Sequence, residues 1–262
     1  ADVSVSSTKD GVGGLVGYYN DGSADNVCEI SDCWTSGEVK SDMKKVGGII
    51  GELYGNTKAE TQVENLNTAL ISNCYSTASV VGKSVVAGIV AYAARSKDPT
   101  AVTDCIAWNE KIEATGVVNT DPSSGAVVGR TFTKHTLRDC YRKQTLDFIC
   151  EILNTEGEWL LNASVCDQEN ADSETKIAVG TYGQSGSDYK LNDCNDWYPY
   201  HGKTATATTV SSVARNLDWD ESIWDFSGDG APALRMAEAE PEQPYDTVGD
   251  IIISDGSLTV NG

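Results

Sequence analysis

The sequence predicts an all-β protein, and its pattern favours a parallel β-helix, a solenoid built of stacked repeats. Two short motifs recur along the chain at irregular intervals. Turn-forming residues are abundant, with 25 glycines against two Met and three Phe among 262 residues. Apolar stripes at the helical period of 3.6 residues do not accompany the motifs. A repeat of this type cannot bury its apolar face alone, so successive repeats must stack around a continuous core.

The first recurring motif is a glycine-rich apolar run. It reads VGGLVG at residues 12–17, VGGIIG at 46–51, VAGIVA at 86–91 and SGAVVG at 124–129. Glycine allows tight bends and a close approach of neighbouring backbones. Because the copies begin 34, 40 and 38 residues apart, we expect constant strands that are joined by loops of variable length.

The second motif is an aliphatic residue, any residue, Asp or Asn, and then Cys. Its five copies end at Cys33, Cys74, Cys105, Cys140 and Cys194. Asp and Asn tolerate left-handed backbone angles, so the motif predicts a corner of the chain. The alternating segments that follow, such as CYSTASV at residues 74–80, predict strands. We expect about five irregular rungs, right-handed by the usual preference of strand crossovers.

These motifs resemble the GLUG-motif repeats of bacterial cell-surface and adhesin-like proteins. The resemblance rests on GLVG at residues 14–17, NCYSTASV at 73–80 and the Trp-rich LDWDESIWDFSGDGAPAL at 217–234. It covers residues 11–141 well and 191–235 more loosely, because the later glycine motifs lose a glycine or the leucine. The resemblance implies an exported surface protein, and the motif itself implies no particular ligand.

The chain divides into a repeat region, a linker and a tail. We assign residues 1–236 to the solenoid, with a strand at 3–5, an insertion at 144–190 that holds a short helix at 146–153, and a cap at 210–236. In the cap, Trp219, Trp224, Phe226 and Leu234 are suited to cover the last rung. Residues 237–244 form an acidic linker with proline. Residues 245–262 predict a β-hairpin with Asp255 and Gly256 in the turn, as a tail or the start of another module.

The five motif cysteines share one register, so on stacked strands they would lie about 4.8 Å apart. Their Cβ vectors would then be parallel, which does not suit the torsion of a disulfide. We therefore expect a structural ladder of buried thiols, which behave as small apolar groups, in place of bridges or a metal site. Cys28, Cys150 and Cys166 lie outside this register, and a Cys150–Cys166 bridge within the insertion stays open.

Aromatic residues accompany the ladder and form the candidate ligand-binding site. Trp34, Tyr75 and Tyr141 each follow a motif cysteine, and Trp108 and Trp197 come three residues after theirs. Neighbouring residues of a strand face opposite sides, so inward cysteines would give an outward aromatic stripe on which sugar rings or peptide side chains stack. In the alternative, the corner shifts the alternation and these rings belong to the core.

The charge excludes some partners. The 19 basic and 39 acidic residues give a net charge of −20, which argues against nucleic acid and against an anionic membrane surface. Apolar runs stay short of the ~18 residues that a membrane span needs. We expect no cofactor and no metal: His135 and His201 lie in unrelated segments, and the acidic cluster is better explained as a solvated loop than as a calcium site. That cluster comprises Asp218, Asp220, Glu221, Asp225 and Asp229.

The sequence therefore predicts a non-enzymatic, extracellular repeat module of a bacterial surface protein. The chain starts at Ala1 without a signal-like leader, which we interpret as a processed product or an excised segment with neighbouring modules. The module would serve adhesion, binding a host or environmental glycan or protein, or would act as a stalk. The alternative is a polysaccharide-acting enzyme or its carbohydrate-binding accessory module, an idea that rests on fold analogy.

Overall fold

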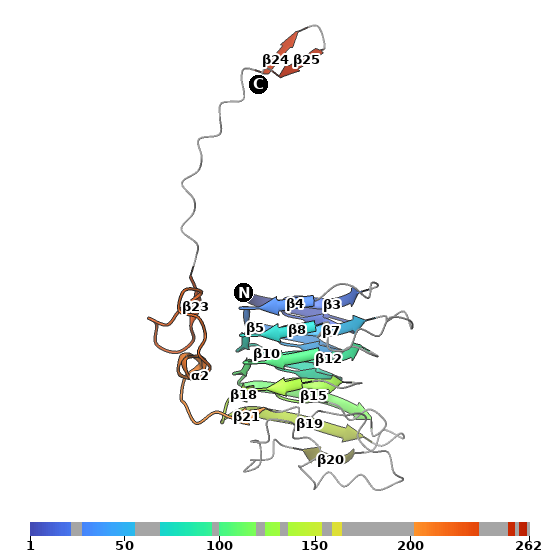
Figure 1. The fold of residues 1–262 in the computed structure, drawn as a ribbon. Helices are drawn as coiled ribbons and strands as arrows, with labels where there is room; N and C mark the ends of the chain where they lie inside the picture. Colours follow the sequence, from blue (N-terminus) through green and yellow to red (C-terminus); the bar gives the residue numbers. More distant parts are fainter. Residues whose placement is uncertain are drawn as a thin grey trace, which may run out of the picture.

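The structure is a computed structural model that describes residues 1–21, 28–55, 69–95, 100–118, 124–131, 136–153, 159–163, 202–235, 251–254 and 257–260. These residues form mostly parallel strands, and the helix among them is α2 (Val210–Asn216). Figure 1 shows the strands in successive layers, from β3 and β4 near the N-terminus to β19 and β20 at the far end. The all-β prediction is confirmed. Within the described part of the chain, no helix has the length and apolar character to cross a membrane.

Successive repeats contribute equivalent strands to parallel sheets. One sheet contains β2 (Val12–Gly13), β6 (Lys44–Gly47) and β11 (Ser84–Ala87). A second contains β3 (Val16–Asp21), β7 (Ile50–Gly55), β12 (Val90–Arg95) and β16 (Val128–Thr131). A third contains β4 (Cys28–Ser31), β8 (Ala69–Ser72), β13 (Thr100–Thr103) and β17 (Thr136–Arg138). The largest sheet contains β1 (Asp2–Ser7), β5 (Trp34–Ser41), β9 (Tyr75–Ser76), β10 (Ser79–Gly82), β14 (Ile106–Ala107), β15 (Lys111–Val118), β18 (Tyr141–Arg142), β19 (Asp147–Leu153), β20 (Trp159–Ala163) and β21 (Lys203–Thr204).

The register of these sheets pairs the motif copies with one another. In the glycine motif, Val46 lies between Val12 and Val86, and Ile50 lies between Val16 and Val90. The cysteine motif aligns in the same way, with Ile71 between Ile30 and Val102. Each repeat is therefore hydrogen-bonded to its neighbours along the stack, although loops of different length separate the motifs.

The corner before each motif cysteine has the predicted backbone. Asp32, Asn73, Asp104 and Asp139 all adopt left-handed angles, with φ between 50° and 54°. A second left-handed row was not expected: it comprises Gly11, Lys45 and Val85, with φ of 73°, 65° and 57°. A β-branched residue such as Val85 is strained in this conformation, so the stack must hold it there.

The glycine motif makes a tight turn whose tip contacts the opposite wall of the repeat. A Cβ on Gly48 would overlap the carbonyl oxygen of Gly88 and the hydroxyl of Ser76. Thr35 Oγ1 donates a hydrogen bond to the carbonyl of Gly48 (2.9 Å) and lies 2.9 Å from Ser76 Oγ. Close approach is therefore what requires glycine here.

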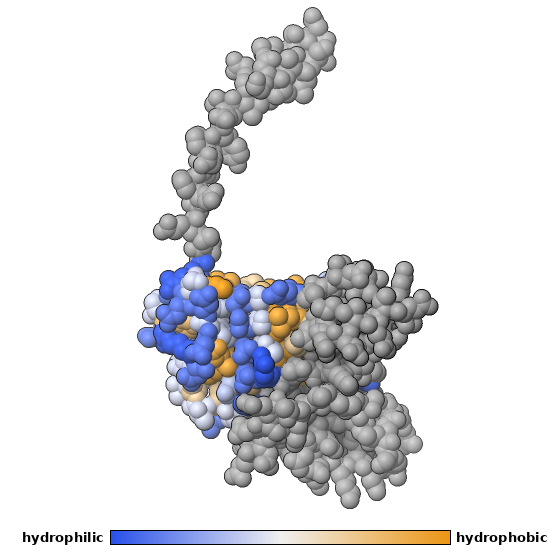
Figure 2. All heavy atoms as spheres, viewed as in Figure 1, coloured by the Kyte–Doolittle hydropathy of each residue, from blue (hydrophilic) through white to orange (hydrophobic). Residues whose placement is uncertain are grey.

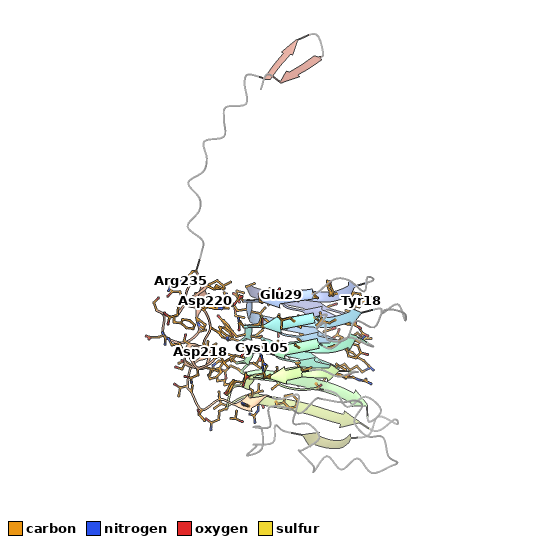
Figure 3. The ribbon with its side chains drawn as sticks, viewed as in Figure 1. Tyr18, Glu29, Cys105, Asp218, Asp220 and Arg235 are labelled. Atoms are coloured by element: carbon orange, nitrogen blue, oxygen red, sulfur yellow. The ribbon has the colours of Figure 1, made fainter. Side chains whose placement is uncertain are left out.

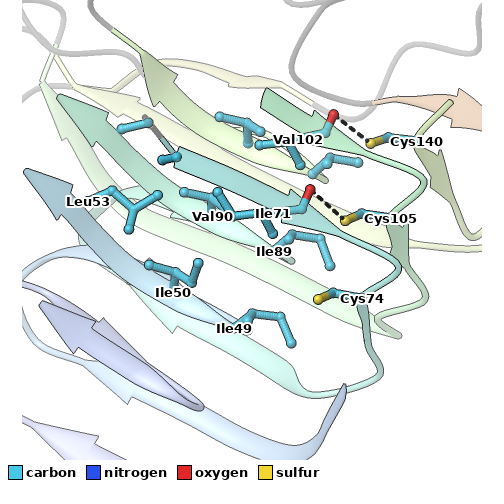
Figure 4. Close-up of a cluster of buried hydrophobic side chains, with 14 of the residues drawn as sticks. Ile49, Ile50, Leu53, Ile71, Cys74, Ile89, Val90, Val102, Cys105 and Cys140 are labelled. Atoms are coloured by element: carbon cyan, nitrogen blue, oxygen red, sulfur yellow. Dashed lines mark hydrogen bonds between the residues drawn. The ribbon is translucent and has the colours of Figure 1, made fainter. Parts of the chain in front are cut away.

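This contact separates two apolar clusters. Ile49, on one side of Gly48, belongs to a cluster with Ile50, Leu53, Ile71 and the cysteines, part of which is drawn in Figure 4. Val46, on the other side, belongs to a cluster with Val39 and Val80. Between them, Asn109 donates to Ser76 Oγ (3.1 Å) and to the carbonyl of Ala78 (2.6 Å).

The helix expected at residues 146–153 is wrong, because this segment is strand β19. It pairs in parallel with β15, with Phe148 beside Ile112, and β20 adds to its other side in antiparallel orientation. Leu146 and Phe148 are buried while Asp147 is exposed. This period-2 alternation continues the repeat pattern into the residues assigned to the insertion, and the pairing with β15 decides the structure.

The cap prediction also needs correction. Residues 206–235, which follow the stack strand β21 and which we call the lateral segment, contain α2, β22 (Trp224–Asp225) and β23 (Ala233–Leu234). The segment lies along the side of the stack and not over its last rung (Figure 1). Its indoles reach the corners of separate repeats: Trp224 Nε1 donates to Asp32 Oδ1 (3.2 Å), and Trp219 Nε1 donates to the carbonyl of Asp104 (3.1 Å). Leu234 remains 37% exposed.

Helix α2 is short and well capped. Thr209 is its N-cap, and its Oγ1 accepts a hydrogen bond from the backbone N–H of Ser212 (3.1 Å). Val210, Val213 and Ala214 are buried, which gives the helix one apolar side against the stack. Figure 2 shows that the outer face of this region is mainly hydrophilic with separate apolar patches.

The C-terminal hairpin is present as β24 (Ile251–Ser254) paired antiparallel with β25 (Ser257–Val260). Ser254 and Ser257 face each other, which leaves a two-residue connection as predicted from Asp255 and Gly256. The turn residues and the linker 237–244 lie outside the described residues.

Candidate ligand-binding face

Three residues of the predicted aromatic stripe, Trp34, Tyr75 and Tyr141, lie in one row on the stack, and Ile106 takes the position between Tyr75 and Tyr141. Trp34, Tyr75, Ile106 and Tyr141 are direct partners on the adjacent strands β5, β9, β14 and β18. The rings of Trp34 and Tyr75 are stacked, with centroids 5.8 Å apart and planes at 6°. The row points away from the cysteines, but it is covered by the lateral segment.

The lateral segment packs on this aromatic row and buries it. Trp219 and Trp224 pack on Tyr75 at centroid distances of 6.3 and 5.8 Å. The hydroxyl of Tyr75 donates to the carbonyl of Pro232 (2.8 Å), and the residue is 3% exposed. Burial raises the pKa of Tyr75 to about 12.

The binding-stripe hypothesis for these aromatics is therefore corrected. Trp34, Trp108 and Tyr141 are partly buried against the same cluster, and Trp197 lies outside the described residues. A row of large aromatic rings would expose a large apolar area to water, which is unfavourable. The indoles of Trp219 and Trp224 cover these rings instead.

Four of the five motif cysteines lie in the described residues, and all four are free thiols. Cys33, Cys74 and Cys105 each donate to the carbonyl two residues earlier, at 3.0 to 3.1 Å. Cys74, Cys105 and Cys140 are buried, and Cys33 at the start of the stack is half-buried. Figure 4 shows the thiols of Cys105 and Cys140 pointing to carbonyls of the preceding repeat. Cys194, Cys166 and the side chain of Cys150 lie outside the described residues.

The environment of Cys33 and Cys105 keeps these two thiols neutral. Burial raises the pKa of Cys105, and a hydrogen bond with Cys74 raises the pKa of Cys33. A neutral thiol is a poor nucleophile and a poor metal ligand. Their chemistry is therefore that of packing groups.

Two carboxylates of the acidic cluster in the lateral segment serve local turns. Asp220 Oδ1 accepts from the N–H of Ser222 (2.7 Å), and Asp225 Oδ1 accepts from the N–H of Ser227 (2.9 Å). These backbone hydrogen bonds lower the pKa of both carboxyls. Across the described ranges, no group of three or more His, Cys, Asp or Glu side chains could hold a metal ion. His135 and His201 lie outside those ranges.

A different row of side chains runs across the sheet formed by β3, β7, β12 and β16. Tyr18, Glu52, Tyr92 and Arg130 are direct neighbours on β3, β7, β12 and β16. Tyr18 is 53% exposed, and Figure 3 shows it at the side of the stack away from the lateral segment. We call these four residues together with Lys45 the outer row.

Two cations of the outer row gather around one aromatic ring. Lys45 Nζ lies 2.7 Å from Glu52 Oε1 and 4.4 Å from the centroid of the Tyr92 ring. Arg130 Cζ lies 6.0 Å from the same centroid. Glu52 is 7% exposed, so its ion pair with Lys45 is shielded from water and holds the lysine over the ring.

The sequence carries a signal for the outer row. Tyr18, Glu52, Tyr92 and Arg130 are the residues that directly follow the four copies of the glycine motif. Lys45 directly precedes the second copy. The aromatic residues that accompany the cysteine motif belong instead to the row that the lateral segment covers.

Comparison with known proteins supports the fold. No family model and no curated protein matches the chain. A solved structure from Bacteroides ovatus, provisionally named an immunoglobulin A1 protease, is similar with a TM-score of 0.51 and 18% sequence identity. The match covers 89% of this chain and 66% of that chain. A likeness at this identity concerns the fold alone.

Proposed function

We propose that the parallel sheets close into a β-solenoid, right-handed by the usual crossover preference. Three features support this proposal. The strands follow the same sheet order in each repeat, for example β6, β7, β8 and then β11, β12, β13. Equivalent motif residues pair directly. The two apolar clusters draw their residues from all of these sheets.

We infer that this solenoid is a non-enzymatic, extracellular repeat module of a bacterial surface protein, and that it binds a ligand on its outer row. The observation that carries this inference is the exposed Tyr18 ring in line with Glu52, Tyr92 and Arg130 on adjacent strands. Strands that are hydrogen-bonded on both sides hold such groups at fixed spacing, which is how a rigid scaffold presents a binding surface. The resemblance to GLUG-motif proteins is the reason for placing the module at the cell surface.

The rival proposal is an enzyme, either one that acts on a polysaccharide or a protease as the name of the Bacteroides ovatus protein suggests. Glycoside hydrolysis uses a pair of carboxyl groups on either side of the scissile bond. The outer row carries one carboxylate, Glu52, which is engaged with Lys45. This arrangement favours binding over catalysis.

The test is a screen of host and plant glycans and of surface proteins, immunoglobulin A1 included, scored for binding and for cleavage with the full chain. We expect binding without cleavage, and we expect Tyr18→Ala to weaken it. Leu234→Ala is the matched control, because this exposed apolar residue lies in the lateral segment. Cleavage of any ligand would overturn the non-enzymatic assignment, and binding that is insensitive to Tyr18→Ala would overturn the assignment of the outer row.

A further inference from the structure

We propose that the C-terminal hairpin of this chain covers the end of the stack at the first repeat, by adding one of its strands to β1. The inference goes beyond the proposed function, because it concerns a part of the molecule away from the outer row. Three observations carry it. The first repeat leaves its apolar core partly open, β1 has backbone groups on a free side, and the sequence of the hairpin gives it one apolar face.

The first repeat covers its apolar residues less completely than the repeats behind it. Leu15 takes the same place in its glycine motif as Ile49 and Ile89 take in theirs. Leu15 is 39% exposed, whereas Ile49 and Ile89 are both 0% exposed. Val3 and Val5 on β1 are only partly buried against the apolar cluster that they join. A further layer at this end would bury these side chains, as the terminal layer of a repeat stack must.

Strand β1 has a free side. It is paired with β5 and with no other strand among the described residues. The carbonyl of Ala1 accepts a hydrogen bond from the N–H of Ser36 on β5 (2.9 Å). Successive residues of a parallel strand direct their backbone groups to opposite neighbours, so Ser4 and Ser6 have theirs on the free side. Such an edge can accept an added strand.

The opposite end of the same sheet already shows this kind of addition. There β19 pairs with β15 on one side, and β20 is added to its other side in antiparallel orientation. The sheet therefore ends in an added antiparallel strand at its far edge. A strand of the hairpin added to β1 would complete the near edge in a similar way.

The hairpin has one face that is wholly apolar in sequence. Its register sets Ile251 opposite Val260 and Ile253 opposite Leu258, and these four positions share one face because side chains alternate along a strand. The other face holds one apolar and three polar residues, namely Ile252, Ser254, Ser257 and Thr259. Two paired strands alone are only marginally stable in water. Addition to β1 would place the apolar face in line with the core of the first repeat.

The chain leaves the lateral segment close to this end of the stack. Leu234 on β23 pairs with Trp224 on β22, and Trp224 Nε1 donates to Asp32 Oδ1 in the first repeat. Figure 1 shows β23 at the same end of the stack as the N-terminus. The 15 residues 236–250 then lead to β24, and a coil of that length spans about 20 Å on average. Such a tether gives an effective concentration of about a millimolar, which favours the chain's own hairpin over that of a second copy.

Hydrogen exchange of single amides, measured by NMR on the full chain at several protein concentrations, tests the proposal. We expect the amides of Ser4 and Ser6 to exchange at least about tenfold more slowly in the wild type than in Leu258→Asp, because a charge on the apolar face keeps the hairpin off the core. Thr259→Asp is the matched control: it adds the same charge to the other face and should exchange like the wild type. Equal exchange of Ser4 and Ser6 in the wild type and Leu258→Asp would overturn the proposal.

Ser4→Pro covers the case in which Leu258→Asp only unfolds the hairpin. Proline is tolerated on an edge strand where its missing N–H would face solvent, so β1 should stay paired with β5. The added strand should be lost, and the amide of Ser6 should exchange as fast as in Leu258→Asp. A Ser6 amide that stays protected in Ser4→Pro would contradict strand addition. Protection that disappears on dilution, together with the mass of a dimer in light scattering, would identify a second copy as the occupant and overturn the assignment to the chain's own hairpin.

Discussion

The stacked repeats and the lateral segment both bury apolar side chains, but they do so by different means. In the repeats, small and aliphatic residues fill equivalent positions, and Val46, Ile50 and Val90 are all 0% exposed. In the lateral segment, indoles do this work, with Trp224 at 0% and Trp219 at 4% exposed. Strands spaced by about 4.8 Å leave room for one modest side chain per layer, whereas the side of the stack has no such limit.

The two regions also differ in how they are attached. Each inner strand of the stack is hydrogen-bonded along its backbone to the strands before and after it. The lateral segment is held by side chains, among them Trp219, Trp224 and Tyr75. In a repeating ladder, the loss of stability from one substitution is shared among many equivalent hydrogen bonds. In a segment held by a few large side chains, the loss of one side chain affects the attachment of the whole segment. Variants that affect one region and spare the other test this difference.

Trp224→Ala should have the largest effect, and the effect should be local. The change removes a fully buried indole and its hydrogen bond to Asp32, which costs about 4 kcal/mol. We expect the lateral segment to detach and expose Tyr75, while the strand signal in far-UV circular dichroism stays. Tryptophan fluorescence and hydrogen exchange would follow the detachment. Leu234→Ala, at a 37% exposed site, is the control and should change neither signal. Loss of the strand signal together with the fluorescence change would contradict a separable segment.

Gly48→Ala should destabilise the stack itself by about 3 kcal/mol, the upper part of the usual range for an added methyl group in a packed site. The new methyl group would overlap the carbonyl of Gly88 and the hydroxyl of Ser76. Because both belong to neighbouring layers, we expect unfolding by denaturant to shift for all probes together. Gly228→Ala is the matched control: nothing lies within 4 Å of its added Cβ, so stability should change by less than about 0.5 kcal/mol. Equal effects of the two variants would show that the turn tip does not need close approach.

Tyr75→Phe should cost about 1 kcal/mol, because it removes one buried hydrogen bond and leaves the carbonyl of Pro232 without it. The cost should depend on pH. A tyrosine in the unfolded chain ionises near pH 10, and burial raises the pKa of Tyr75 to about 12. The advantage of the wild type is therefore fully present below about pH 10 and is lost as the pH rises toward about 12. Denaturant titrations of both chains at pH 8 and pH 11 measure this difference.

Tyr18→Phe, at an exposed ring, is the control. A constant difference between wild type and Tyr75→Phe across this range would contradict the buried hydroxyl.

The sequence was informative wherever a feature repeats. The four glycine motifs and the Asp or Asn corners predict strands and turns that the structure shows, because equivalent residues must occupy equivalent backbone positions. The left-handed corners at Asp32 and Asn73 followed from the residue type alone. The second left-handed row could not be predicted, since Lys45 and Val85 do not prefer that conformation and tertiary packing imposes it.

The sequence was less informative about surfaces. The outward direction of Trp34 and Tyr75 agrees with strand alternation, but the lateral segment that covers them follows Tyr75 by more than a hundred residues. Such a long-range contact leaves no local pattern. A cap over the last rung is expected because the end of a stack exposes its core. Trp219 and Trp224 pack on Tyr75 at the side of the stack instead. The outer row was readable from the residues after each glycine motif, but only Tyr18 and Tyr92 among them resemble a binding site in isolation.

Thiol reactivity should show the smallest effect. It tests whether the cysteines become less accessible from the first repeat to the repeats behind it. Cys33 in the first repeat is half-buried, while Cys74, Cys105 and Cys140 behind it are buried. With Ellman's reagent on the native chain, we expect Cys33→Ser to remove one equivalent of accessible thiol and Cys105→Ser to remove none. Since the hydrogen bond with Cys74 raises the pKa of Cys33, its reaction should be slow at neutral pH and accelerate as the pH rises. Under denaturing conditions the wild type should show at least the five free thiols of the described residues. A Cys105→Ser chain that loses a native equivalent would mean that the interior opens between repeats, and the stack would then lack the protection that its two-sided hydrogen bonding predicts.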